Sequence, residues 1–131
     1  MLYQFLLKSL EYEEKERICG PNRNSYYKTD HDATAMALKT DYYSGLGSNM
    51  HAAYNTQIAV SKGIICAYYT SQSRTDIKDF IETLKRFNSF FGFYPKIVCA
   101  DSGYGSLENY RFLADHNIEN LGPSPILEGI L

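Results

Sequence analysis

Residues 75–91 carry the clearest structural pattern in the chain. Apolar side chains recur there at steps of three and four residues, which predicts a helix with one buried face. They are Ile77, Phe80, Ile81, Leu84, Phe87 and Phe91. Thr75 offers an N-cap hydroxyl and Gly92 is placed to end the helix. Asp76 and Asp79 are most simply charges at the helix start, where the helix dipole favours anions. A helix with one apolar face has to pack against another element.

Two β-rich runs precede this helix. Side chains alternate over residues 53–60, which predicts a strand with two different faces. One face holds Tyr54, Thr56, Ile58 and Val60, and the other holds Asn55, Gln57 and Ala59. A short turn at residues 61–63 leads into a second β-rich run at 64–70, so the two runs are expected to form a hairpin.

A strand, a helix and a further strand are expected after residue 92. Residues 96–100 read K-I-V-C-A, a run typical of a strand buried on both faces. A glycine-bearing turn and a helix capped by Ser106 follow, and residues 118–121 are suited to another strand. The order of elements predicts an α/β domain in which helices pack on a mixed sheet.

The N-terminal part has a different character. Residues 1–19 are expected to form a helix, and residues 20–49 a polar connector. Within the connector, residues 32–39 are suited to a short helical turn and residues 44–49 to a loop. The predicted α/β domain then occupies residues 50–131.

Composition excludes several classes of protein. Thirteen Lys and Arg against 15 Asp and Glu give a formal charge of −2, which argues against a free-standing nucleic-acid binder. Three widely spaced cysteines form neither a disulfide framework nor a zinc motif, so we expect a reduced, cytoplasmic chain. No apolar run reaches the length of a membrane span, and no membrane association is expected.

Asp101 is the leading candidate for chemistry. It follows the predicted 96–100 strand directly, and functional groups of α/β sheets gather at the carboxyl ends of strands. A carboxylate there suits Mg²⁺, which prefers oxygen ligands. The alternative is that Asp101 only caps the turn that follows, and the local pattern alone favours capping.

The other candidates have simpler interpretations. His31 lies between two aspartates, but this loop triplet lacks the spacing of a helical metal site and is better interpreted as a solvated turn. Gly103 and Gly105 are only a weak signal for a phosphate loop, and close backbone packing between strand and helix explains them as well. Tyr104 is suited to packing against the helix that follows rather than to stacking on a base.

Four segments together carry a resemblance. They are N-R-N-S-Y-Y-K-T-D-H-D-A-T at 22–34, A-A-Y-N-T-Q-I-A-V at 52–60, R-T-D at 74–76 and Y-P-K-I-V-C-A-D-S-G-Y-G-S-L-E-N-Y at 94–110. In this order and spacing they resemble a bacterial insertion-sequence DDE transposase, of the subgroup with T-D-x-D-A-T, Y-N-x-Q and A-D-x-G-Y segments. The resemblance covers roughly residues 20–121.

This resemblance implies an RNase H-like fold, a mixed sheet flanked by helices. It also implies an active site of three acids that hold two Mg²⁺ or Mn²⁺ ions for DNA strand cleavage and transfer. Asp101 matches the second acid and is thus expected to be catalytic and a metal ligand. Asp30 and Asp32 match the T-D-x-D segment, which we interpret as structural or substrate-positioning.

The other two acids have no match here. The family's first acid lies upstream in a D-G-T-like segment, and its final Glu lies beyond residue 121; Glu128 is not assigned to that role. We therefore expect a truncated catalytic domain that lacks the first strand and the C-terminal part. Such a domain is expected to bind no metal tightly and to be inactive alone, since one carboxylate cannot fix two divalent ions.

Partners follow from the same interpretation. The intact enzyme would bind transposon-end DNA, and this chain is suited to forming a homo-oligomer or to pairing with a full-length transposase. One alternative is a non-catalytic interaction fragment that inhibits the full-length enzyme through its open sheet edge. Another is an unrelated Mg²⁺-dependent α/β enzyme such as a phosphatase, which would need further carboxylates at neighbouring strand ends. None is evident in the sequence.

Overall fold

The computed structural model of the chain describes residues 1–38 and 50–122. These residues belong to two compact units. The first comprises Met1–Tyr54 with Gln72–Arg74, and the second comprises Asn55–Ser71 with Thr75–Leu131. The predicted loop at 44–49 lies outside the described residues.

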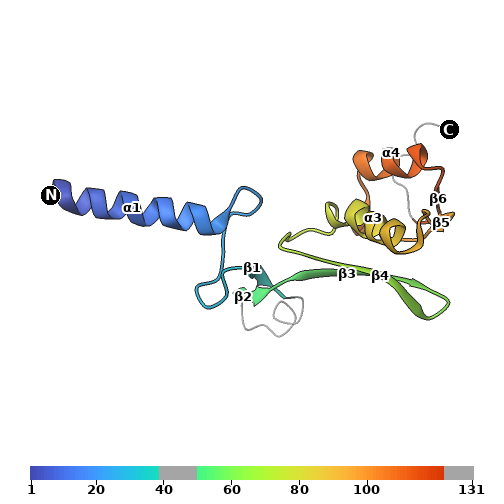
Figure 1. Ribbon diagram of the computed structural model, residues 1–131, viewed down its shortest axis with the longest axis horizontal. Coiled ribbons are helices and arrows are strands. Elements are labelled where there is room, and N and C mark those ends of the chain that lie inside the picture. The colour runs from blue at the N-terminus through green and yellow to red at the C-terminus, as the bar shows by residue number, and fades with distance from the viewer. Residues whose placement is uncertain (39–49, 123–131) are drawn as a thin grey trace. The chain divides into compact units, whose positions relative to one another are not determined.

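The first unit contains a long helix and a short antiparallel sheet (Figure 1). Helix α1 spans Leu2–Cys19, as predicted, and none of its residues is buried. Strand β1, Thr34–Ala37, pairs with β2, Met50–Ala53. The helical turn predicted for residues 32–39 is therefore wrong over residues 34–37. Their pairing with a distant segment overrides the helix propensity of Ala and Met.

Arg23 organises the polar connector of the first unit. Its guanidinium donates hydrogen bonds to the carbonyls of Ile18 and Cys19, at 3.1 and 2.9 Å, and to that of Ala33 at 3.1 Å. The last carbonyls of a helix have no partner within the helix, and an arginine side chain can supply one. Arg23 thereby joins the end of α1 to the start of β1.

The predicted hairpin is confirmed in the second unit. Strand β3, Asn55–Ser61, runs antiparallel to β4, Ile64–Ser71. The predicted strand at 53–60 is divided at Tyr54, because Ala53 pairs in the β1–β2 sheet. The two turn residues, Lys62 and Gly63, have φ values of 51° and 80°. Positive φ at both positions is characteristic of the tight turn that matches the twist of paired strands.

The turn supports a first prediction. Gly63→Ala should lower the free energy of unfolding by about 1–2 kcal/mol, because a Cβ is disfavoured in the left-handed region. Lys62→Gly is the matched control, since it places a permissive residue at the neighbouring left-handed position. Urea denaturation of both variants checks this. Equal stability of Gly63→Ala and the parent chain would contradict the turn geometry.

The helix that follows starts later than predicted. Helix α3 spans Asp79–Phe91, with Lys78 as its N-cap and no side-chain capping bond. The prediction of Thr75 as the N-cap is therefore wrong. The backbone N–H of Asp79 donates to the carbonyl of Asp76 at 3.0 Å, so residues 76–79 form a turn before the helix. The end is as predicted: Gly92 has φ 75° and its N–H donates to the Asn88 carbonyl at 2.7 Å.

Helix α3 packs against one face of the hairpin and also contacts α4 (Figure 1). The hairpin face that it covers contains buried Gln57 and Ala67. The alternation predicted for β3 is confirmed, but the opposite face, with Ile58 and Val60, is exposed. The covered face is thus the more polar of the two.

The C-terminal elements have the predicted order. Strand β5, Ile97–Val98, leads through a 3₁₀ turn at Ser102–Tyr104 into α4, Leu107–Asp115, and then into β6, Glu119–Asn120, parallel to β5. The Ser106 side chain caps α4 by accepting a hydrogen bond from the Asn109 N–H, as predicted. The core cluster consists of Phe80, Leu84, Leu113 and Ile118.

One prediction about β5 is wrong. Ile97 is 52% exposed and Cys99 is exposed, so the strand is not buried on both faces. The core covers only the side of Val98 and Ala100. The predicted α/β class is confirmed, although the described strands form three two-stranded sheets rather than one mixed sheet. No helix in the described part of the chain is long and apolar enough to cross a membrane.

Candidate functional site

Asp101 lies just beyond β5, at the start of the 3₁₀ turn. Its backbone is extended, and its Oδ1 accepts a hydrogen bond from the Gly103 N–H at 2.8 Å. The side chain is exposed. The capping interpretation is therefore confirmed, but capping engages only one carboxylate oxygen. Among the described residues we find no hydrogen bond to Oδ2, which leaves this atom able to bind a ligand.

Gly103 lies close to two carboxylates. A Cβ on this residue would lie 2.9 Å from Asp101 Oδ1 and 3.8 Å from Asp76 Oδ2. At Gly105, a Cβ would lie 3.1 Å from the Tyr110 hydroxyl. Close packing, one of the two explanations that the sequence left open, therefore accounts for both glycines, although the nearest neighbours are side-chain oxygens. The carboxylates of Asp101 and Asp76 therefore both lie close to the position that a side chain at residue 103 would occupy.

Two amide side chains of β3 hold Asp76. Its Oδ1 accepts hydrogen bonds from Asn55 Nδ2 and Gln57 Nε2, each at 2.9 Å. Gln57 Nε2 also donates to Asn55 Oδ1 at 2.9 Å. Asn55 and Gln57 meet the same carboxylate because alternate residues of a strand point to one face. Interpreting Asp76 as a helix-start charge missed this role, although the Asn-x-Gln spacing on β3 was a usable signal.

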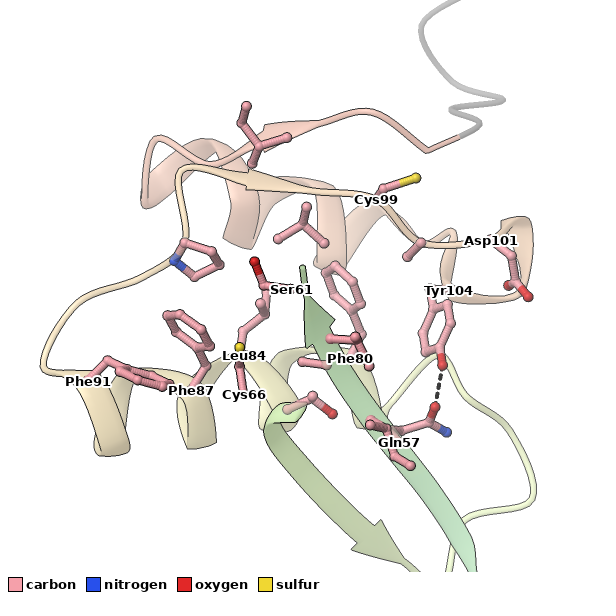
Figure 2. Close-up of a pocket in the computed structure, with 18 of the residues that line it drawn as sticks. Gln57, Ser61, Cys66, Phe80, Leu84, Phe87, Phe91, Cys99, Asp101 and Tyr104 are labelled. Atoms are coloured by element: carbon pink, nitrogen blue, oxygen red, sulfur yellow. Dashed lines mark hydrogen bonds between the residues drawn. The ribbon is translucent and has the colours of Figure 1, made fainter. Parts of the chain in front are cut away.

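Tyr104 connects the turn to β3 and α3. Its hydroxyl donates to Gln57 Oε1, and its ring lies 5.7 Å from that of Phe80, measured between centroids (Figure 2). The ring therefore packs on α3, the preceding helix, and the core cluster that it contacts also contains Leu113 of α4, the following helix on which we predicted it to pack. Burial raises the pKa of the Tyr104 phenol, and the nearby carboxylates of Asp76, Asp101 and Asp79 raise it further.

Asp79 lies in the first turn of α3, as predicted, but it is buried, which its interpretation as a helix-start charge did not predict. Only 3% of the residue is exposed, and its Oδ2 accepts a hydrogen bond from Ser71 Oγ at 2.6 Å. Burial raises the pKa of Asp79 above its usual value, and the hydrogen bond from Ser71 opposes this rise. The desolvation of the charged form is thus the dominant effect.

A pH dependence follows from the raised pKa of Asp79. The folded state holds the proton more tightly, so this group stabilises the fold most below its unfolded pKa, near about 4, and less as pH rises through the folded pKa. Asp79→Asn keeps an oxygen acceptor for Ser71 and carries no charge. We expect the parent chain to lose stability relative to Asp79→Asn in urea denaturation as pH rises above about 4. A difference that does not change with pH would contradict this.

The Asp30–Asp32 triplet forms a turn in the first unit. Asp30 Oδ1 accepts hydrogen bonds from the N–H groups of Asp32 and Ala33, and its Oδ2 accepts one from the Tyr54 hydroxyl at 2.8 Å. These bonds, the Tyr54 hydroxyl first, lower the pKa of Asp30. His31 and Asp32 are exposed. The turn is confirmed, and it is solvated at His31 and Asp32, whereas Asp30 is half-buried and hydrogen-bonded through both carboxylate oxygens.

The described carboxylates near Gly103 are too few to hold two divalent ions. Among residues 1–38 and 50–122, no three His, Cys, Asp or Glu side chains come together as a metal site. Asp101 offers one exposed carboxylate, and Asp76 Oδ1 already accepts two amide hydrogen bonds. Carboxylates are the correct ligand type for Mg²⁺, but these two do not make a two-metal centre.

Comparison with protein families identifies the chain. A family model described as "Transposase DDE domain" matches residues 18–124. The chain belongs to the DDE transposase domain family. Neither a curated protein nor a solved structure matches it.

Membership of this family adds three facts. DDE transposase domains have an RNase H-like fold, and this agrees with the mixed α/β structure of the chain. Members of the family bind DNA and typically use divalent metal ions. The matched region includes both Asp76 and Asp101.

Proposed function

We propose that the chain is part of the catalytic domain of an insertion-sequence DDE transposase, with Asp101 as one of the acids that bind Mg²⁺ or Mn²⁺. The observation that carries this proposal is the position of Asp101 after β5, with an exposed carboxylate that the described residues hold through Oδ1 alone. Family membership supports it, because the A-D-x-G-Y segment lies within the matched region.

The chain's own residues have three roles in this proposal. The Gly103 N–H fixes the direction of the Asp101 carboxylate. Tyr104 anchors the turn through its hydrogen bond to Gln57. Asp76, held by two amides, places a second negative charge beside Gly103. When bound, the divalent ions of such an enzyme activate water or a 3′-hydroxyl for attack on a DNA phosphodiester.

The proposal also holds that the active site is incomplete within this chain. The described residues bring two carboxylates together where a two-metal centre needs more ligands, so we expect the chain to lack strand transfer activity by itself. Its formal charge of −2 also favours DNA binding mainly through segments outside this chain.

Plasmid nicking with Mg²⁺ or Mn²⁺ tests this function. The chain and its Asp101→Asn variant should both leave supercoiled DNA intact. Metal-dependent nicking that is lost in Asp101→Asn would support the role of Asp101, but it would contradict the proposal that the chain lacks part of the active site. Metal-dependent nicking that survives Asp101→Asn would contradict the role of Asp101.

A further inference from the structure

Gln57 is a polar residue on the covered face of β3, where only 6% of it is exposed. Its side-chain amide has hydrogen-bond partners at both ends. Nε2 donates to Asp76 Oδ1 and to Asn55 Oδ1, each at 2.9 Å, and Oε1 accepts from the Tyr104 hydroxyl (Figure 2). An apolar side chain of similar length would fill this space without the cost of desolvating an amide. Packing alone therefore does not explain an amide at this position.

Asp76 determines which end of the Gln57 amide faces which partner. A carboxylate only accepts hydrogen bonds, so the Nε2 end of Gln57 has to face Asp76. The carbonyl end then faces Tyr104, whose hydroxyl is the donor that this oxygen needs. Asp76, Gln57 and Tyr104 thus form a chain of hydrogen bonds, and the carboxylate at one end sets its direction.

The other end of this chain of hydrogen bonds is the turn that carries Asp101. The Tyr104 N–H donates to the Asp101 carbonyl at 3.2 Å, and the Gly103 N–H donates to Asp101 Oδ1 at 2.8 Å. Tyr104 and Gly103 belong to the same 3₁₀ turn. Asp101 itself is exposed, so packing does little to select its rotamer. Holding the Tyr104 side chain against β3 therefore restrains the N–H group that directs the carboxylate.

We propose that Gln57 is a positioning residue for Asp101. Acting through Tyr104, it holds the 3₁₀ turn in the geometry in which the Gly103 N–H directs the Asp101 carboxylate. Asp76 acts on Asp101 through Gln57, and this role does not require Asp76 to contact a metal ion. The inference deepens the proposed function and rests on it for the use that is made of the positioned carboxylate. The positioning itself exists without metal and can be measured separately.

The side-chain rotamer of Asp101 in the metal-free full chain tests this inference. Three-bond couplings from the backbone nitrogen and carbonyl carbon to Cγ report χ1. We expect one rotamer in the parent chain and averaging between rotamers in Gln57→Met and in Tyr104→Phe. Tyr104→Phe removes one hydroxyl and keeps the ring on Phe80, so it decides the question if Gln57→Met does not fold. Tyr94→Phe, the matched control, should keep the parent rotamer, because Tyr94 packs on the same core but lies outside the turn.

Mn²⁺ titration supplies a second readout. Broadening of the Gly103 amide resonance should need about threefold more Mn²⁺ in Gln57→Met and Tyr104→Phe than in the parent chain, the effect of losing one hydrogen bond. An unchanged Asp101 rotamer in the folded variants would overturn the inference whatever their loss of stability, because Gln57 would then have a structural role only. No broadening in the parent chain would instead contradict metal binding by Asp101, and the metal-free rotamers would still decide the role of Gln57.

Discussion

Leu113→Ala is expected to unfold the second unit or to leave it only marginally folded. Leu113 is 3% exposed and belongs to a cluster of four buried apolar residues. Truncating a buried leucine costs about 2–5 kcal/mol, which is a large part of the stability of an ordinary domain. In a cluster this small, few neighbours are available to fill the cavity.

Leu107→Ala is the matched control for this variant. Leu107 lies on the same helix, α4, but is 54% exposed, so its replacement should change stability by less than about 0.5 kcal/mol. Urea denaturation followed by circular dichroism measures both. Similar effects of the two substitutions would contradict the packing of α4 on the core.

Asp76→Ala is expected to cost about 2–3 kcal/mol. The substitution removes a charged acceptor shared by the amides of Asn55 and Gln57, and Gln57 is buried. It also removes one of the charges that raise the pKa of Tyr104, so that pKa should fall towards its usual value.

Asp76→Asn separates these two effects. It keeps an oxygen acceptor but loses the charge, so it should be more stable than Asp76→Ala while lowering the Tyr104 pKa in the same way. Urea denaturation and ultraviolet titration of the phenol provide the two readouts. Full stability of Asp76→Ala would show that the amide network contributes nothing to the fold.

Local signals were enough to predict much of the second unit. The hairpin, the end of α3 and the Ser106 cap depend on neighbouring residues, and the structure has each of them as predicted. Turn and capping interactions between residues close in the sequence determine these features.

Features that depend on distant residues were not predictable in the same way. β1 is a strand only because β2, across residues 39–49, pairs with it. The role of Asp76 depends on β3, some twenty residues earlier in the chain. The exposure of Ile97 depends on what covers the other side of β5, and no periodic pattern within the strand encodes that.

The candidate site was predictable in part. The position of Asp101 at the end of β5 followed from the apolar run before it, but its bond to Gly103 and its proximity to Asp76 needed coordinates. From the sequence, capping and metal binding by Asp101 were treated as alternatives. The geometry allows both, because the cap uses only Oδ1.

Paramagnetic broadening by Mn²⁺ is the most direct test of the metal-binding role of Asp101. We expect weak binding, in which the amide resonances of Asp101 and Gly103 broaden first. The broadening at Gly103 should be unchanged in Asp115→Asn, the control variant. It should disappear in Asp101→Asn. Broadening centred on another part of the chain, or broadening at Gly103 that persists in Asp101→Asn, would contradict the assignment of Asp101 as a metal ligand.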